Sequence, residues 1–406
     1  MFRNIAWLGG GSVLVKPVWI LFLVAVCPRL LGVEAYGVMQ SALALAGIAL
    51  VFSDLGTSTL TLREVSVQPE EGGRYLSNVL VLRGALATVC VAGAVGVAAV
   101  LGYQRAALFG VAAACAYVVA QHLVGFTRVF FRVAEDLRLE AFSTVAERAL
   151  VVVIGGAFLV ATRSPVWTLA GMALGAAVVG LIQVSWVSRH LARFDARSVS
   201  GPFLRQAAWL AVPLGVADLL LALYYRTDQV MVEVMQGATA AGQYGQAYRI
   251  LESLSLLPAI VVQSALFPRL SRLTASGAPE DVRQLAMRTG ALLTLSGVAV
   301  SGVLWTVAPE LIQLLSGDPS FAPAGGALRV LIWTFPLTCA KDVLYITALA
   351  RRRYRVSVVI YAGAVILNVA LNLWAIPRYG IVGASLTTLV SEAFTVFLFA
   401  FAHRRS

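Results

Sequence analysis

Ionisable side chains inside long apolar stretches are the residues of this sequence best placed to do chemistry. Lys16 stands beside Pro17 within a run that is otherwise apolar from Ile5 to Cys27. A Lys at the centre of a membrane-spanning helix costs roughly 2.5–3.5 kcal/mol on insertion scales, so it usually faces the bundle interior and has a partner. Because Pro17 removes a backbone hydrogen bond and kinks the helix, we expect Lys16 to line an internal cavity. The alternative is a structural or gating ion pair with Asp218, the acid at the centre of a later apolar run.

Helical geometry places two further pairs of charged residues. Arg249 and Glu252 are three residues apart and therefore share one helix face, where they can form an ion pair. Glu147 and Arg148 are adjacent and point in different directions, so at least one of them is expected to face the bundle interior. Arg suits phosphate recognition because its planar fork binds phosphate oxygens through two hydrogen bonds. Arg249 therefore either contacts an anionic substrate or serves Glu252 alone.

A group of oxygen-bearing side chains could couple transport to an ion. Asn368 and Asn372 are four residues apart on one helix face. Together with Asp218 and Thr388 they could offer the oxygen ligands that a hard cation prefers. A second hypothesis is proton coupling, and a third is transport without either ion. The acids considered for proton coupling are Asp218, Glu147 and Glu392.

The elements that must position these residues are membrane-spanning helices. The chain of 406 residues is 59% hydrophobic and only 13% charged, whereas a soluble domain carries about a quarter charged residues. Apolar stretches recur at about the 20-residue length that crosses a bilayer core. The sequence predicts an all-α integral membrane protein with twelve transmembrane helices, and the small residues of "GMALGAAVVG" (171–180) predict a close helix contact. The predicted spans are 5–27, 37–61, 77–102, 106–127, 140–161, 166–188, 207–231, 244–268, 290–312, 327–350, 356–377 and 380–402.

The distribution of cations determines the predicted topology. With the N-terminus inside, 20 Arg side chains fall on the cytoplasmic side and 4 on the opposite side, which is the asymmetry expected of cytoplasmic loops. We therefore expect both termini in the cytoplasm, and the net charge of +11 reflects topology rather than nucleic-acid binding. Arg83 and Arg329, near the ends of their spans, are expected to extend to the interface, and Arg128 falls in a predicted loop. Lys341 and Asp342 are expected to be neutralised within their own half of the chain.

The two halves of the chain repeat each other. "RNIAWL" at Arg3 matches "RQAAWL" at Arg205, and the same offset of 202 residues places Asp218 opposite Lys16. Six spans repeated in one orientation predict two pseudo-symmetric six-helix lobes around a central cavity, as in alternating-access transporters. The predicted domains are an N-lobe, 1–188, a cytoplasmic linker, 189–206, and a C-lobe, 207–406.

Three segments carry a resemblance to a known family. "LGVEAYGVMQSALALAGIALVFSDLGTSTLTLREVS" (31–66) resembles the second-helix signature of the polysaccharide flippases, within the multidrug/oligosaccharidyl-lipid/polysaccharide superfamily. "YRTDQVMVEVMQGATAAGQYGQAYRILESLSLLPAIVVQSALFPRLS" (225–271) is similar to their seventh-to-eighth helix segment, and "IPRYGIVGASLTTLVSE" (376–392) resembles the start of their last helix. The resemblance extends over nearly the whole chain.

The resemblance implies a flippase that translocates an undecaprenyl-pyrophosphate-linked oligosaccharide from the inner to the outer leaflet of the bacterial cytoplasmic membrane, for surface polysaccharide biosynthesis. It implies a cation-lined cavity, with Lys16, Arg226 and Arg249 toward the pyrophosphate. Asp54, where the family signature also has an acid, would orient a cavity cation or take part in coupling. The implied partners are the lipid-linked substrate, membrane lipids and a polysaccharide polymerase that acts on the product. No cofactor and no enzymatic activity are implied.

Three other functions fit parts of the sequence. An ion-coupled multidrug exporter of the same superfamily would need cavity acids for cationic drugs, whereas Lys16, Arg226 and Arg249 indicate an anionic substrate. A lipid II flippase typically has two more C-terminal helices, and its sodium site has an Asp where Asn372 stands. A glycan polymerase or acyltransferase normally needs a large external loop or a catalytic His, and the predicted external loops are short. We therefore expect an oligosaccharide flippase.

Overall fold

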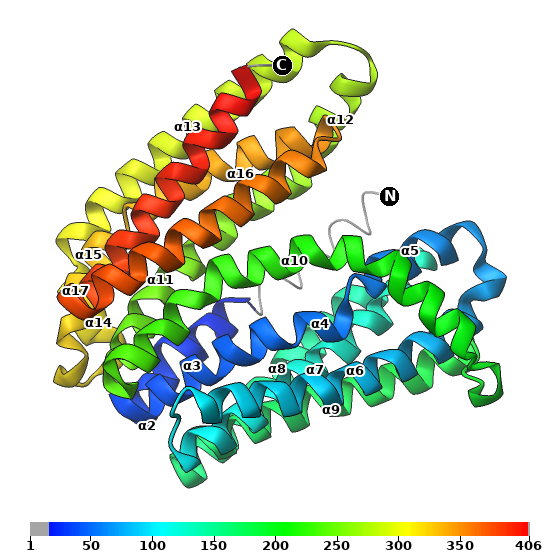
Figure 1. Ribbon diagram of the computed structural model, residues 1–406, viewed down its shortest axis with the longest axis horizontal. Helices are drawn as coiled ribbons and strands as arrows, with labels where there is room; N and C mark the ends of the chain where they lie inside the picture. The colour runs from blue at the N-terminus through cyan, green and yellow to red at the C-terminus, as the bar shows by residue number, and fades with distance from the viewer. Residues whose placement is uncertain (1–15, 405–406) are drawn as a thin grey trace. The chain divides into compact units, whose positions relative to one another are not determined.

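The computed structural model describes residues 16–404, and all the regular structure in these residues is helical. Figure 1 shows the long helices in chain order, from blue near the N-terminus to red near the C-terminus. After helical residues 16–21, the first half contains η1 (Phe22–Val26), α2 (Cys27–Leu31), α3 (Val33–Ala49), α4 (Val51–Asp54), α5 (Thr57–Val67), α6 (Gly72–Val100), α7 (Arg105–Val133), α8 (Leu137–Thr162), α9 (Pro165–His190) and α10 (Gly201–Gln236). The second half contains α11 (Ala238–Val261), η4 (Val262–Leu266), α12 (Phe267–Ala275), α13 (Pro279–Thr306), α14 (Ala308–Ser316), α15 (Ala322–Leu331), α16 (Thr334–Ala350) and α17 (Tyr354–Arg404).

Length and composition identify the helices that are able to cross a membrane. Among the described residues eight segments qualify on their own, and ten do if two bent helix pairs are each counted as one span. One of the eight, Tyr354–His403, contains a break at Gly380 (φ 55°, ψ −136°) and so holds two predicted spans. Together with the helical residues 16–31, these helices correspond to the twelve that the sequence predicts, and the start of the first predicted span, 5–27, lies outside the described residues. The all-α membrane fold is confirmed.

The chain divides into two compact units. Unit 1 contains the described residues up to Leu31 together with Val38–Ala222, and unit 2 contains Gly32–Gly37 together with the chain from Leu223 onward. The boundary after Ala222 lies inside α10, because this helix starts in unit 1 and continues to Gln236. The division into lobes at 189–206 stays a prediction.

A small-residue contact joins the helices of unit 1. Helix α9 packs against both α7 and α8. Gly175 of α9 lies directly on the backbone of α8, since a Cβ built on it would be 2.8 Å from the Leu150 carbonyl oxygen. The small residues of 171–180 therefore do form a close helix contact. The same bundle has an apolar core of Leu76, Val79, Phe126, Phe130, Phe131, Val187 and Ala192.

A kink in α17 brings polar residues of unit 2 together. Pro377 interrupts the helix, and three residues later Gly380 adopts a positive φ that glycine tolerates without strain. Beyond the kink, Thr387 donates a hydrogen bond to Asn372 Oδ1 at 2.5 Å. In a straight helix these two residues would be about 22 Å apart. The kink therefore places residues of the last two predicted spans in one cluster.

Candidate functional site

A break in the second predicted span positions Asp54 in unit 1. Helix α4 ends at Asp54 and α5 begins at Thr57, because Leu55 (φ 46°) and Gly56 (φ 75°) are both left-handed. Asp54 Oδ1 accepts hydrogen bonds from Thr57 Oγ1 at 3.0 Å and from the Ser58 backbone N–H at 3.2 Å. Its carboxylate thus caps the first turn of α5.

Arg83 is the cation that pairs with Asp54. Its guanidinium forms an ion pair with Asp54, donates to Thr57 Oγ1 at 2.8 Å, and lies 4.4 Å from the centre of the Phe126 ring. Arg83 is only 8% exposed, so the prediction that it extends to the interface is wrong. The physical reason is that α6 begins at Gly72, five residues before the apolar window 77–102, and Arg83 consequently lies well inside the helix.

Glu147 is held in a second buried network of unit 1. It is 2% exposed, and its Oε2 is 2.5 Å from Arg128 Nη2. Arg128 also donates to Ser143 Oγ at 2.8 Å, and Gln183 donates to the same oxygen at 2.6 Å. The loop position predicted for Arg128 is wrong because α7 continues to Val133. Glu147 therefore has a fixed counter-charge.

Arg148 points away from Glu147 and packs on the N-terminal helix. Its guanidinium lies 4.7 Å from the centre of the Trp19 ring, and Trp19 in turn contacts Tyr117. Lys16 lies three residues before Trp19 and, like Arg148, is half-buried. Neither cation takes part in an ion pair with another described residue, and Asp218, which is exposed, is not paired with Lys16.

A buried carboxylate in unit 2, that of Asp228, has only neutral partners. Asn372 Nδ2 donates to Asp228 Oδ1 at 2.6 Å, and Oδ2 accepts from Thr388 Oγ1 at 2.6 Å and from Tyr244 OH at 3.1 Å. Asn372 Nδ2 also donates to Asn368 Oδ1 at 3.0 Å. We name these five residues, Asp228, Tyr244, Asn368, Asn372 and Thr388, the Asp228 cluster.

The Asp228 cluster differs by one residue from the oxygen site expected from the sequence. Asn368, Asn372 and Thr388 do meet, but the acid is Asp228 and not Asp218, which belongs to unit 1. The two acids are ten residues apart on α10, about 15 Å along its axis. The position of each residue along its predicted span is the signal that identifies Asp228. Asp228 and Asn372 are both near the outer ends of their spans, whereas Asp218 is central.

The buried carboxylate of the Asp228 cluster would be stabilised by a positive charge. Asp228 is 2% exposed, and it forms no ion pair with any described residue. A buried carboxylate that lacks a counter-ion is costly, and it either takes up a proton or binds a cation. Carboxylate, amide and hydroxyl oxygens are all present, and Thr388 is only half-buried. This set of oxygen atoms could therefore bind either a proton or a small hard cation.

Glu392 is also buried in unit 2, but it has a cationic partner. Its Oε1 is 2.6 Å from Lys341 Nζ and 2.7 Å from Thr338 Oγ1, while Tyr224 OH donates to Oε2. Lys341 Nζ also donates to Tyr225 OH at 2.9 Å. We name these residues the Lys341 cluster. Lys341 is thus neutralised within its own half of the chain, but by Glu392 rather than Asp342.

The remaining cations inside the predicted spans divide into neutralised and free ones. Arg249 Nη1 is 2.6 Å from Glu252 Oε2, which is the pair expected from their spacing. Arg329 is exposed and donates to the Trp305 carbonyl at 3.2 Å, as an interfacial residue would. Arg226 is half-buried and forms no ion pair with a described residue, although its charge acts on Glu252 at longer range. We name Lys16, Arg148 and Arg226 the uncompensated cations.

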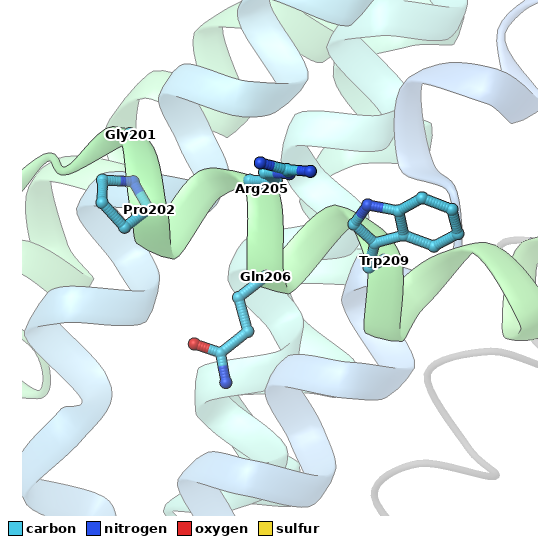
Figure 2. A pocket seen from close by; sticks show the side chains of 5 residues that line it. All are labelled: Gly201, Pro202, Arg205, Gln206 and Trp209. Atoms are coloured by element: carbon cyan, nitrogen blue, oxygen red, sulfur yellow. The ribbon is translucent and has the colours of Figure 1, made fainter.

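A surface pocket lies apart from these clusters at the start of α10. It has a volume of about 550 Å³ and shares no residue with them. Figure 2 shows Arg205 and Gln206 on one turn of the helix and Trp209 on the next, with Pro202 at its beginning. The opposite face of the same segment packs Phe203 and other apolar side chains into a core. The pocket has no acid and only one cation, so we do not assign it to the candidate site.

Comparisons with known proteins identify the family of the chain. The family described as polysaccharide biosynthesis protein matches residues 1–274, and the family described as MatE matches residues 213–374. Over 183 residues the chain is 29% identical to the probable flippase AglR of Haloferax volcanii. That match covers 41% of this chain and 35% of AglR, so the chain spans about a third of the length of this relative.

Solved structures show the same fold at low sequence identity. An inward-facing multidrug resistance MATE family transporter of the MOP superfamily has a TM-score of 0.76 at 15% identity, covering 97% of this chain and 94% of that one. The lipid II flippase MurJ, in an inward closed conformation, also has a TM-score of 0.76, at 13% identity, covering 98% of this chain and 87% of that one. The matched family and these relatives are transporters and flippases, not enzymes.

Proposed function

Because the chain belongs to the polysaccharide biosynthesis protein family, we propose that it is a flippase that moves a lipid-linked oligosaccharide from the inner to the outer leaflet by alternating access. The lipid carrier in this proposal is undecaprenyl pyrophosphate, and the membrane is the bacterial cytoplasmic membrane with both chain termini inside. A polymerase that uses the translocated product is the expected partner.

The uncompensated cations are the observation that carries this proposal. Of the seven cations inside the predicted spans, Arg83, Arg249 and Lys341 are neutralised by acids and Arg329 lies at the interface. Lys16 and Arg148 in unit 1 and Arg226 in unit 2 form no ion pair with a described residue. Holding such charges inside a membrane protein is costly unless an anion binds there. A pyrophosphate group supplies that anion, and each Arg can bind it through two hydrogen bonds.

Ion coupling is the second part of the proposal. The Asp228 cluster would bind one monovalent cation, either Na⁺ or H⁺, because its carboxylate has only neutral donors. The other intramembrane acids are poorer candidates, since Glu147 and Glu392 already have cationic partners. Asp218 is exposed. The energy of an ion gradient would then drive the conformational change.

A multidrug exporter is the competing function, and the MatE match over residues 213–374 favours it. Export of cationic drugs would need free acids rather than free cations. Lipid II transport is the third candidate, which the likeness to MurJ supports at the level of the fold.

Reconstitution into proteoliposomes tests the proposal. The substrate is a pyrophosphate-linked lipid oligosaccharide, and an impermeant lectin reports its arrival in the outer leaflet. We expect protein-dependent movement that slows about tenfold or more in Lys16→Ala, Arg148→Ala and Arg226→Ala, because each loses a charge-assisted contact. Arg329→Ala is the matched control and should move substrate at the wild-type rate. Ion-driven efflux of small organic cations, with no movement of the glycan, would instead establish the exporter.

A further inference from the structure

The two buried acids of unit 2 lie in adjacent layers built by the same two helices. Helix α10 contributes Tyr224 to the Lys341 cluster and Asp228 to the Asp228 cluster, four residues later. Helix α17 contributes Glu392 to the first and Thr388 to the second, again four residues apart. Four residues are about one helical turn, or about 6 Å. The two clusters are therefore consecutive layers of one polar core.

The layers have the same kinds of hydrogen-bond donor but a different charge. In each, hydroxyl groups of a Tyr and a Thr donate to the carboxylate. The Asp228 layer adds an Asn amide and so keeps one negative charge. The Lys341 layer adds an ammonium group and is neutral. The sum over both layers is one negative charge.

Lys341 is fully enclosed, and both hydrogen-bond partners of its ammonium group belong to its own layer. Its side chain is 0% exposed, its Nζ contacts Glu392 Oε1 and Tyr225 OH, and it lies 5.1 Å and 5.0 Å from the ring centres of Tyr224 and Tyr225. Both oxygens of Glu392 are likewise engaged. Asp342 is the next residue on α16 and therefore points away by about 100°, and Tyr361 packs on Tyr224. No ligand from outside is needed to complete this layer.

We propose that Lys341 is a built-in counter-ion that prevents Glu392 from taking up a cation. The polar core of unit 2 then binds one monovalent cation per protein, at Asp228, although it contains two stacked acids. Lys341 would in this way set the ion stoichiometry of transport. The inference rests on the proposed coupling at the Asp228 cluster, and it goes beyond that coupling by identifying the residue that limits it to one ion.

Replacing Lys341 by Met should leave the carboxylate of Glu392, like that of Asp228, with neutral donors only. Glu392 would then have only the hydroxyl donors of Tyr224 and Thr338, the situation that we propose draws a cation to Asp228. The test measures ²²Na⁺ bound and protons taken up per molecule of the purified full-length protein. We expect one cation for the wild type, two for Lys341→Met, and one for Lys341→Met/Glu392→Gln, in which both layer charges are removed.

Two further variants keep the proposal testable if Lys341→Met does not fold. Asp228→Asn should abolish cation uptake. Glu392→Gln leaves the Lys341 charge uncompensated one turn from Asp228, so the affinity for Na⁺ or H⁺ should fall about tenfold or more by repulsion. Wild-type affinity in Glu392→Gln, or a single cation in folded Lys341→Met, would overturn the role of Lys341 alone. No cation uptake by the wild type would overturn the proposed coupling as well, while glycan movement would still be tested separately.

Discussion

Each buried acid in this chain must be stabilised by a counter-charge, a proton or a bound ion. Of the buried acids, Glu147 has Arg128 and Glu392 has Lys341, and the half-buried Asp54 has Arg83. Asp228 is buried as deeply as Glu147 and Glu392 and has hydroxyl and amide donors instead. A single side chain thus distinguishes an acid that serves structure from one that is available to an ion.

Asp228→Asn should uncouple the protein while leaving it folded. The amide keeps the size of the side chain and some of its hydrogen bonds, but it removes the charge that attracts the cation. We expect glycan movement in proteoliposomes to lose its dependence on a Na⁺ or H⁺ gradient. Asp218→Asn is the matched control on the same helix, and its gradient dependence should remain. Equal gradient dependence in Asp228→Asn and the wild type would contradict the assignment.

Arg128→Ala should destabilise the protein because Glu147 would remain buried without a partner. Breaking a buried ion pair in this way costs about 3–5 kcal/mol, and Arg128→Met/Glu147→Gln should recover most of the loss. Arg132→Ala is the control, because Arg132 is 48% exposed in its pair with Glu140 and should contribute less than about 1 kcal/mol. Thermal unfolding in detergent measures all three. Equal melting temperatures for Arg128→Ala and Arg132→Ala would refute the buried-pair interpretation.

At the scale of elements, close helix approach depends on glycines at defined positions. Gly175→Val would place a branched side chain against the backbone of Leu150 and force α8 and α9 apart. Overpacking of this kind costs about 1–3 kcal/mol. Gly96→Ala in α6 is the control, since a Cβ there meets nothing within 4 Å. It should leave stability unchanged or raise it slightly. The opposite order of melting temperatures would argue against the α8–α9 contact.

The helices could be predicted from the sequence more fully than the polar clusters that they position. Apolar length is a local property, so the spans and the lobe repeat are visible in the chain itself. Which polar residues meet depends on features that hydropathy does not reveal. The positions predicted for Arg83 and Arg128 are wrong because α6 and α7 extend beyond their apolar windows. The meeting of Asn372 and Thr387 depends on the kink at Gly380.

The acid of the Asp228 cluster also could not be identified from the sequence. The internal repeat drew attention to Asp218 because it aligns with Lys16, yet α10 presents Asp228 to the cluster instead. Sequence repetition indicates which segments are equivalent, but the kink of the facing helix determines which turn of α10 meets it. The two Asn members can be predicted because their spacing on one helix is a local signal.

At the scale of the whole molecule, the charges inside the predicted spans are unequal in sign. Three cations lack an acidic partner, and they occur in both units. The proposed function explains these cations by an anionic substrate, and a neutral or cationic substrate would not explain them. The central claim is therefore that the charge of the lipid linkage, rather than the sugar, is what the protein recognises.

The most direct test compares two substrates that have the same glycan and the same polyprenyl chain, one joined by pyrophosphate and the other by a neutral linkage. Leaflet-resolved movement in proteoliposomes is measured for each. The account predicts that the pyrophosphate substrate moves about tenfold faster or more, and that this advantage disappears when Lys16, Arg148 and Arg226 are all replaced by Ala. Equal rates for the two substrates in the wild-type protein would contradict it.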